Sequence, residues 1–148
     1  MENSITSLLL KFEEILKEFS RNFPSFEAVY LLDGEGFTIV SLGRKEGEKV
    51  LYHLINLLKE DFSTLILLEI EDSNTRLCLA RIPNTNYFLA VYASRNIAAG
   101  LIRVKIKHLS RDLKYYLDSL DKSIKENEEI QEVNIQDLKR LLEFLSKR

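Results

Sequence analysis

The residue types that most often perform catalysis or hold a metal are few in this chain. Two histidines, His53 and His108, lie in different predicted helices, and the single cysteine, Cys78, lies between Leu77 and Leu79 in a predicted strand. Neither a C-x-x-C nor an H-x-x-x-H pattern occurs, so the spacing that a zinc site needs is missing. We therefore expect no metal, no cofactor and no enzymatic activity, and we interpret Cys78 as a small core residue.

Two glycine-containing segments carry charged residues that could belong to a chemical site. Gly43-Arg-Lys-Glu-Gly47 precedes a predicted helix, yet it lacks the G-x-x-x-x-G-K-S/T spacing of a phosphate-binding loop. Asp33-Gly-Glu-Gly-Phe37 carries two carboxylates, but its glycines can adopt positive φ and favour a tight reversal between two apolar runs. We interpret the first as a strand-to-helix connection and the second as a hairpin turn.

Charged residues are distributed unevenly along a chain whose net charge is −2. Between Arg95 and Lys114, six basic residues stand against a single acid, Asp112, whereas acids dominate from Asp118 to Asp137. The near-neutral total predicts no nucleic-acid partner. The basic stretch is interpreted either as a solvated helix face or as a docking site for an acidic partner or for the chain's own acidic tail.

The sequence carries no sign of a membrane or export segment. Apolar residues nowhere form the uninterrupted run of roughly 18 that a membrane span requires. The first residues include Glu2, Asn3 and Ser4 rather than a basic signal followed by an apolar run. A single cysteine agrees with a reducing compartment. We expect a cytoplasmic protein with no membrane insertion.

Hydrophobic periodicity and turn residues predict an alternation of helices and short strands. The expected elements are a helix through Ile5 to Phe19, a hairpin over Phe26–Leu42, a helix through Val50 to Phe62, strands over Leu65–Glu71, Arg76–Ile82 and Tyr87–Ala93, and a helix of about 24 residues from near Ile97. We expect residues 1–120 to form one α/β domain of the α+β type. A charged linker over 121–134 and an amphipathic C-terminal helix over 135–148 are expected to follow.

The second predicted helix has more apolar surface than one contact needs. Its apolar arc covers about 160°, against the ~100° required to pack on a single sheet. The strand at Leu65–Glu71 is also mostly apolar, and as an open edge it would be prone to aggregation. Both features indicate a further buried contact, supplied either by a second copy of the chain or by the C-terminal helix folding back in a monomer.

The order α-β-β-α-β-β-β-α carries two local motifs, Asp33-Gly-Glu-Gly-Phe37 and Gly100-Leu-Ile-Arg103. With them, residues 4–120 resemble the roadblock / dynein light chain family. The resemblance implies a roadblock/profilin-like fold, in which a five-stranded antiparallel sheet has helices one and three on one face and helix two on the other. Helix two departs from the family pattern, because Tyr52 and His53 occur where many members are rich in alanine.

The resemblance also implies a homodimer. Helix two would lie against its mate, and strand three would pair with its mate so that the sheet continues across the dimer. The residues expected at this interface are Val50, His53, Leu54, Leu57, Leu65, Leu67 and Glu69.

The function implied is that of a non-catalytic homodimeric adaptor or regulator of a Ras-like small GTPase. It would act by positioning the partner's switch loops, with Arg103, Lys107 and Arg111 as candidate contacts. Two alternatives from other classes stay open. One is a ligand-sensing module of the profilin, PAS or GAF kind, which would need a sizeable apolar pocket between sheet and helix. The other is a structural subunit that recruits a partner through its C-terminal helix.

Overall fold

A computed structural model describes residues 2–23, 25–43, 45–58, 67–71 and 74–146; within these ranges, the side chains of 2–4, 45, 67 and 128–137 are not described. Its elements are α1 (Glu2–Asn22), β1 (Phe26–Asp33), β2 (Thr38–Gly43), the 3₁₀ helix η1 (Lys45–Gly47), α2 (Glu48–Leu57), β3 (Leu67–Glu71), β4 (Thr75–Arg81), β5 (Tyr87–Ser94) and α3 (Ala99–Ser146). The predicted order of helices and strands is confirmed, with η1 added before α2.

The strands form one antiparallel sheet of five strands in the order β2-β1-β5-β4-β3. The middle strand, β5, pairs with both β1 and β4, and Leu89, Ala90 and Val91 are fully buried. This run has no polar side chain because both of its faces are covered by other elements. β3 lies at one edge of the sheet, as expected for strand three.

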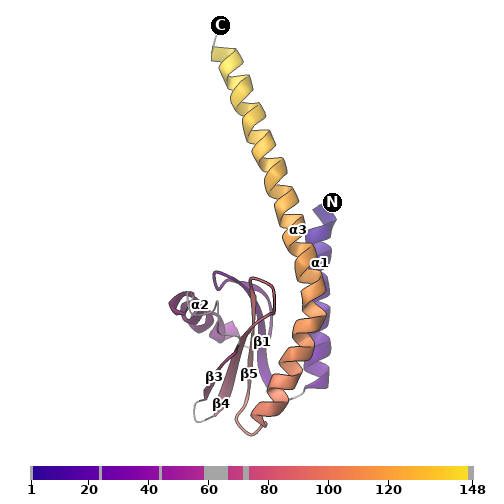
Figure 1. Ribbon diagram of the computed structural model, residues 1–148, viewed down its shortest axis with the longest axis vertical. Helices are drawn as coiled ribbons and strands as arrows, with labels where there is room; N and C mark the ends of the chain where they lie inside the picture. Colours follow the sequence, from indigo (N-terminus) through magenta and orange to yellow (C-terminus); the bar gives the residue numbers. More distant parts are fainter. Residues whose placement is uncertain (1, 24, 44, 59–66, 72–73, 147–148) are drawn as a thin grey trace.

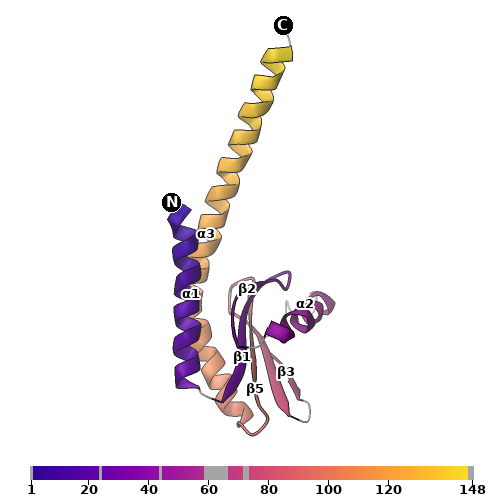
Figure 2. The same cartoon turned by 180° about the vertical axis from the view of Figure 1, so that it is seen from behind.

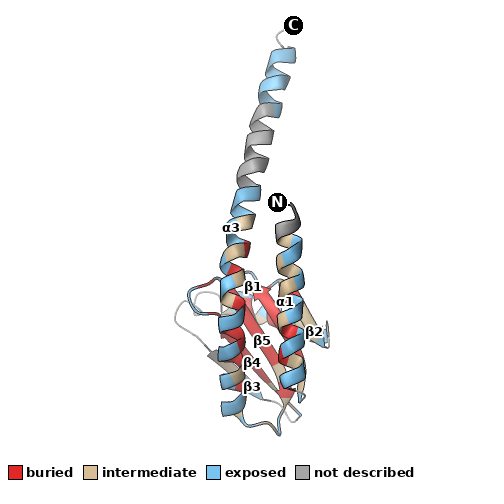
Figure 3. Ribbon diagram, turned by 90° about the vertical axis from the view of Figure 1, so that its right-hand side faces the viewer, coloured by how far each residue is buried: buried red, intermediate tan, exposed pale blue. Residues whose placement is uncertain are grey.

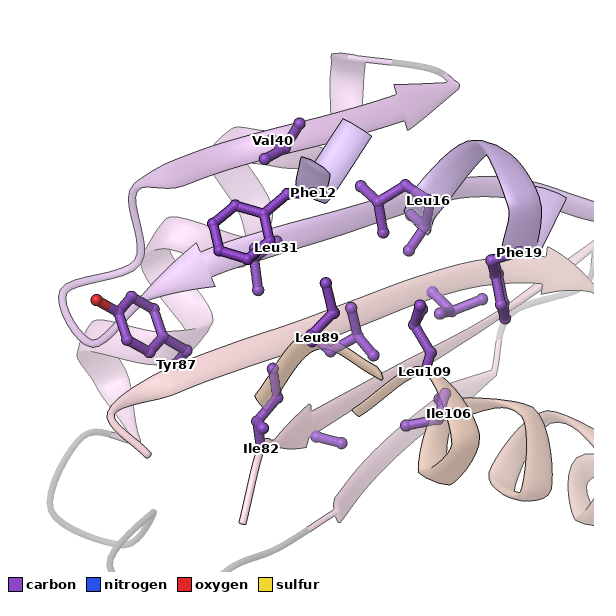
Figure 4. Close-up of a cluster of buried hydrophobic side chains, with 14 of the residues drawn as sticks. Phe12, Leu16, Phe19, Leu31, Val40, Ile82, Tyr87, Leu89, Ile106 and Leu109 are labelled. Atoms are coloured by element: carbon purple, nitrogen blue, oxygen red, sulfur yellow. The ribbon is translucent and has the colours of Figure 1, made fainter. Parts of the chain in front are cut away.

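The helices cover the two faces of the sheet unequally. α1 and α3 lie side by side on one face, and α2 lies alone on the other (Figures 1 and 2). Phe12 and Leu16 of α1 and Leu109 of α3 pack against strand residues such as Leu89 in the larger core (Figure 4). The residues that face α1 and α3 from the middle strands are buried (Figure 3).

The smaller core lies between α2 and the opposite face of the sheet. Leu51 and Ile55 of α2 are fully buried against Tyr30, Leu79 and Phe88. Leu51 and Ile55 are four residues apart, so they occupy one side of the helix, and Leu54 and Leu58 pack against the same core while partly buried. The predicted arrangement, with helices one and three opposite helix two, is confirmed.

α3 differs from the prediction, because it continues without a break for 48 residues. The expected linker over 121–134 is helical, and the C-terminal helix is the end of α3 rather than a separate element. The prediction was wrong because the segment contains neither Gly nor Pro and is rich in Glu and Lys, which are good helix formers. How the chain divides into independently stable domains stays a prediction.

The end of α3 projects away from the sheet (Figure 1), and it lies far from α2. We call residues 125–146 of α3 the arm. Every described side chain of the arm is exposed, including the apolar stripe of Leu138, Leu141, Leu142 and Leu145. The alternative in which the C-terminal helix folds back over α2 is therefore not what the structure shows.

Removing residues 125–148 tests whether the arm contributes to the stability of the rest of the chain. Because its described side chains are exposed, we expect the free energy of unfolding to change by less than about 0.5 kcal/mol. Urea denaturation followed by circular dichroism measures this. As a control, Phe12→Ala empties a fully buried position and should cost about 3–5 kcal/mol. A truncated chain that aggregates, or loses as much stability as the control, would show that the arm belongs to the core.

Candidate interaction surfaces

Two side chains with catalytic potential, Cys78 and Asp33, have structural roles. Burial raises the pKa of the Cys78 thiol to about 11, so little of the nucleophilic thiolate forms near neutral pH. Asp33 accepts hydrogen bonds from the backbone N–H groups of Glu35 (2.9 Å) and Phe37 (3.0 Å) and thereby fixes the hairpin turn. Among the described residues, no group of three or more His, Cys, Asp or Glu side chains is placed to hold a metal.

α2 carries an exposed apolar side on one flank. Val50 is 52% exposed and Leu57 is 79% exposed, whereas Leu54 is half-buried against the smaller core. His53 is exposed between them and contacts the ring of Tyr52. We call Val50, His53, Leu54 and Leu57 the α2 shoulder. The structure thus brings four of the predicted interface residues together on one surface.

The opposite flank of α2 is attached to the β1–β2 turn. The Asn56 side chain donates to the Glu35 carbonyl oxygen (2.7 Å), and the rings of Phe37 and Tyr52 lie 5.2 Å apart between centroids. Gly36 has φ +94°, and a Cβ at this position would lie 3.1 Å from the Tyr52 Cα. The positive φ of the turn therefore favours glycine, and the close approach of α2 leaves little room for a side chain. These contacts fix the rotation of α2, so that the α2 shoulder faces away from the hairpin.

The contact between Phe37 and Tyr52 was not predicted from the sequence. Phe37 is 54% exposed even with Tyr52 beside it. The sequence signal that could have indicated such a contact was the position of Phe37, a large aromatic residue directly after a turn. Sequence periodicity could not show that Tyr52, on the far side of helix two, would lie over it.

The β3 edge lies beside the smaller core. In the described residues, β3 pairs with β4 on one side and with no strand on the other. Ile70 is 41% exposed on the same face as half-buried Leu68, which packs into the smaller core. Of the predicted interface residues in this strand, Leu65 lies outside the described residues, and the side chain of Leu67 is not described.

Glu69 points to the other face of the sheet, where it is held by α3. Arg103 donates from Nε and from a terminal guanidinium nitrogen to the two Glu69 carboxylate oxygens, at 2.5 and 3.0 Å. The hydrogen bonds from Arg103 lower the pKa of Glu69, and they raise the pKa of Arg103 itself. Glu69, a predicted interface residue, and Arg103, a predicted partner contact, thus bind each other.

Lys107 and Arg111 follow Arg103 at intervals of four residues and are exposed on α3. This spacing places the three side chains in one row on the helix surface. α3, which carries this row, lies on the face of the sheet opposite to α2 (Figure 1), so the predicted partner contacts and the α2 shoulder belong to elements on opposite faces. None of the helices searched within the described residues is long and apolar enough to span a membrane.

Glu69→Gln tests the contribution of the link between β3 and α3. Because Arg103 lowers the folded pKa of Glu69 below its ordinary value of 4.5, the ionised carboxylate stabilises the fold above that value. This stabilisation is lost as pH falls through the lowered pKa. We therefore expect the variant to be less stable at neutral pH and to lose less stability between neutral pH and about pH 3.

Urea denaturation at both pH values measures the effect of Glu69→Gln. Glu14→Gln, which removes an exposed pair with Lys11, is the matched control and should behave like the unmodified chain. An unchanged loss of stability on acidification in Glu69→Gln would contradict the assignment.

No family model matches the chain, and no curated protein matches it by sequence. Solved structures do match. Myxococcus xanthus MglB is similar with a TM-score of 0.66 at 17% identity, over 76% of this chain and 91% of that one. The gliding protein MglB from Thermus thermophilus is similar with a TM-score of 0.65 at 11% identity, over 76% of this chain and 92% of that one. A roadblock/LC7 domain from Streptomyces avermitilis is similar with a TM-score of 0.55 at 18% identity, over 68% of this chain and 92% of that one. The resemblance predicted from the sequence is therefore confirmed in three dimensions: this chain has the roadblock/LC7 fold.

Proposed function

We propose that the chain is a non-catalytic homodimeric adaptor that binds and regulates a Ras-like small GTPase in the cytoplasm. Two features carry the proposal: the exposed apolar α2 shoulder, and the edge of β3 that pairs with no strand in the described residues, both in a chain with the roadblock/LC7 fold. The GTPase itself comes from what the family resemblance implies. The comparisons favour neither the ligand-sensing nor the structural-subunit alternative.

Association through the α2 shoulder and the β3 edge would remove two unfavourable features together. Burying an exposed Leu or Val side chain contributes about 1.5–3 kcal/mol, so Val50 and Leu57 of two copies supply a substantial driving force. Pairing of β3 with its mate would satisfy backbone N–H and C=O groups that otherwise face solvent. The proposed interface comprises Val50, His53, Leu54, Leu57, Leu65, Leu67 and Glu69, with Ile70 added from the structure.

The proposed regulation works by positioning the partner rather than by donating a catalytic group. Cys78 is buried, and Asp33 is used by the hairpin turn, so neither is available for chemistry on a bound nucleotide. Lys107 and Arg111 are the proposed polar contacts to the partner. Arg103 would contribute less, because its guanidinium is already bound by Glu69.

Leu57→Glu tests the dimer, because it places a charge at the most exposed apolar position of the α2 shoulder. Sedimentation velocity at micromolar concentration should show a dimer for the unmodified chain and a monomer for the variant. Leu141→Glu makes the same change at an exposed leucine of the arm and should remain dimeric. A monomeric unmodified chain, or a dimeric Leu57→Glu, would refute the proposed interface.

Affinity capture with purified Ras-like GTPases of the source cell tests the partner. Each GTPase is offered in its GDP form and bound to a non-hydrolysable GTP analogue. We expect at least one to be retained, with a clear preference for one nucleotide state. Lys107→Glu with Arg111→Glu should weaken retention at least about tenfold, whereas Lys122→Glu, farther along α3, should not. Failure to retain any GTPase in either state would count against the function.

A further inference from the structure

A half-enclosed cavity lies between α3 and the end of β4, on the face of the sheet opposite to α2. Its volume is about 670 Å³, within the range of about 300–1,000 Å³ typical of small-molecule sites. We call it the α3–β4 cavity.

The floor of the α3–β4 cavity is apolar. Ala80 of β4 and Ile106 of α3 are buried there, and Pro83 lies at the end of the strand. An aromatic ring or a short acyl chain placed on this floor would be removed from water. The floor therefore suits the apolar part of a ligand.

Ser110 also lines the cavity. The residue is 6% exposed, so its hydroxyl lies close to the buried floor. The other buried polar residue described, Thr85, donates to the Ile82 carbonyl oxygen and accepts from the Tyr87 N–H. A serine hydroxyl can both donate and accept a hydrogen bond, so Ser110 can bind a polar group of a ligand in the cavity.

The rim of the cavity is strongly basic. Five of its residues are cations, and no acid occurs among the described residues that line it: Arg81, Arg103, Lys107, Arg111 and Lys114. Arg103 is paired with Glu69, and Arg81 donates to the Thr85 carbonyl oxygen. Lys107, Arg111 and Lys114 form no ion pair in the part of the chain that the structure describes. The unpaired charge favours an anion.

We infer that the α3–β4 cavity binds a small amphiphilic anion, an acidic group carried on an aromatic ring or a short acyl chain. The apolar part lies on Ala80 and Ile106, and the acidic group meets Lys107 and Arg111 at the rim, within reach of the Ser110 hydroxyl. This site shares Lys107 and Arg111 with the proposed partner contacts, and it leaves the α2 shoulder free for a second copy.

A titration of the ¹⁵N-labelled full-length chain tests the site with three probes. Naphthalene-2-sulfonate combines a ring with an anion, 2-naphthol has the ring without the charge at neutral pH, and sulfate has the charge without the ring. We expect saturable amide shifts for naphthalene-2-sulfonate at Ala80, Ile106 and Ser110, and none in α2. The other two probes should bind at least about tenfold more weakly.

Variants separate the cavity from adventitious binding. Lys107→Ala with Arg111→Ala should weaken naphthalene-2-sulfonate at least about tenfold, and Ser110→Ala about fivefold. Lys122→Ala, a cation on the same helix outside the cavity, should leave the affinity unchanged. The inference is overturned by equal affinity for the three probes, by unchanged affinity in the double variant, or by shifts confined to the arm. These measurements contain no GTPase, so they stand or fall independently of the proposed function.

Discussion

The structure depends on covering both faces of a five-stranded sheet with three main helices. A helix with its side chains is about 10 Å wide, and five strands span about 19 Å between the outer axes. α1 and α3 together match that width. α2 is alone and only ten residues long, so the second face is buried as far as Leu79 of β4 but is left open at Ile70 of β3. The exposure of Ile70 results from this mismatch, and it lies on the strand that forms the open edge of the sheet.

Specific contacts hold the α2 shoulder and the β3 edge in place. Asn56 and the Phe37–Tyr52 ring contact fix α2 to the first hairpin, and Arg103 fixes β3 to α3 through Glu69. A surface held in this way loses little conformational freedom when a second copy binds, which favours association. The Arg103 link also couples the edge strand to the helix that carries the basic row and the α3–β4 cavity.

Local patterns predicted most of the fold. The order of elements, the buried β5 and the hairpin at Asp33–Phe37 followed from periodicity and turn residues, because these act over a few positions. The linker over 121–134 was mispredicted because charge was taken as a sign of a break, although helix propensity favoured continuation. Glu69–Arg103 and Phe37–Tyr52 join residues far apart in sequence, and no single-sequence pattern identifies such pairs. The α3–β4 cavity depends in the same way on how α3 packs over β4.

Hydrogen–deuterium exchange as a function of protein concentration tests the central claim, that a second copy completes the sheet at β3. If β3 pairs with its mate, the amides of Leu67–Glu71 and the α2 peptide should be protected at high micromolar concentration and should exchange faster on dilution, while β5 stays protected throughout. Rapid exchange in β3 at every concentration, with β5 protected, would contradict a dimer built on this edge.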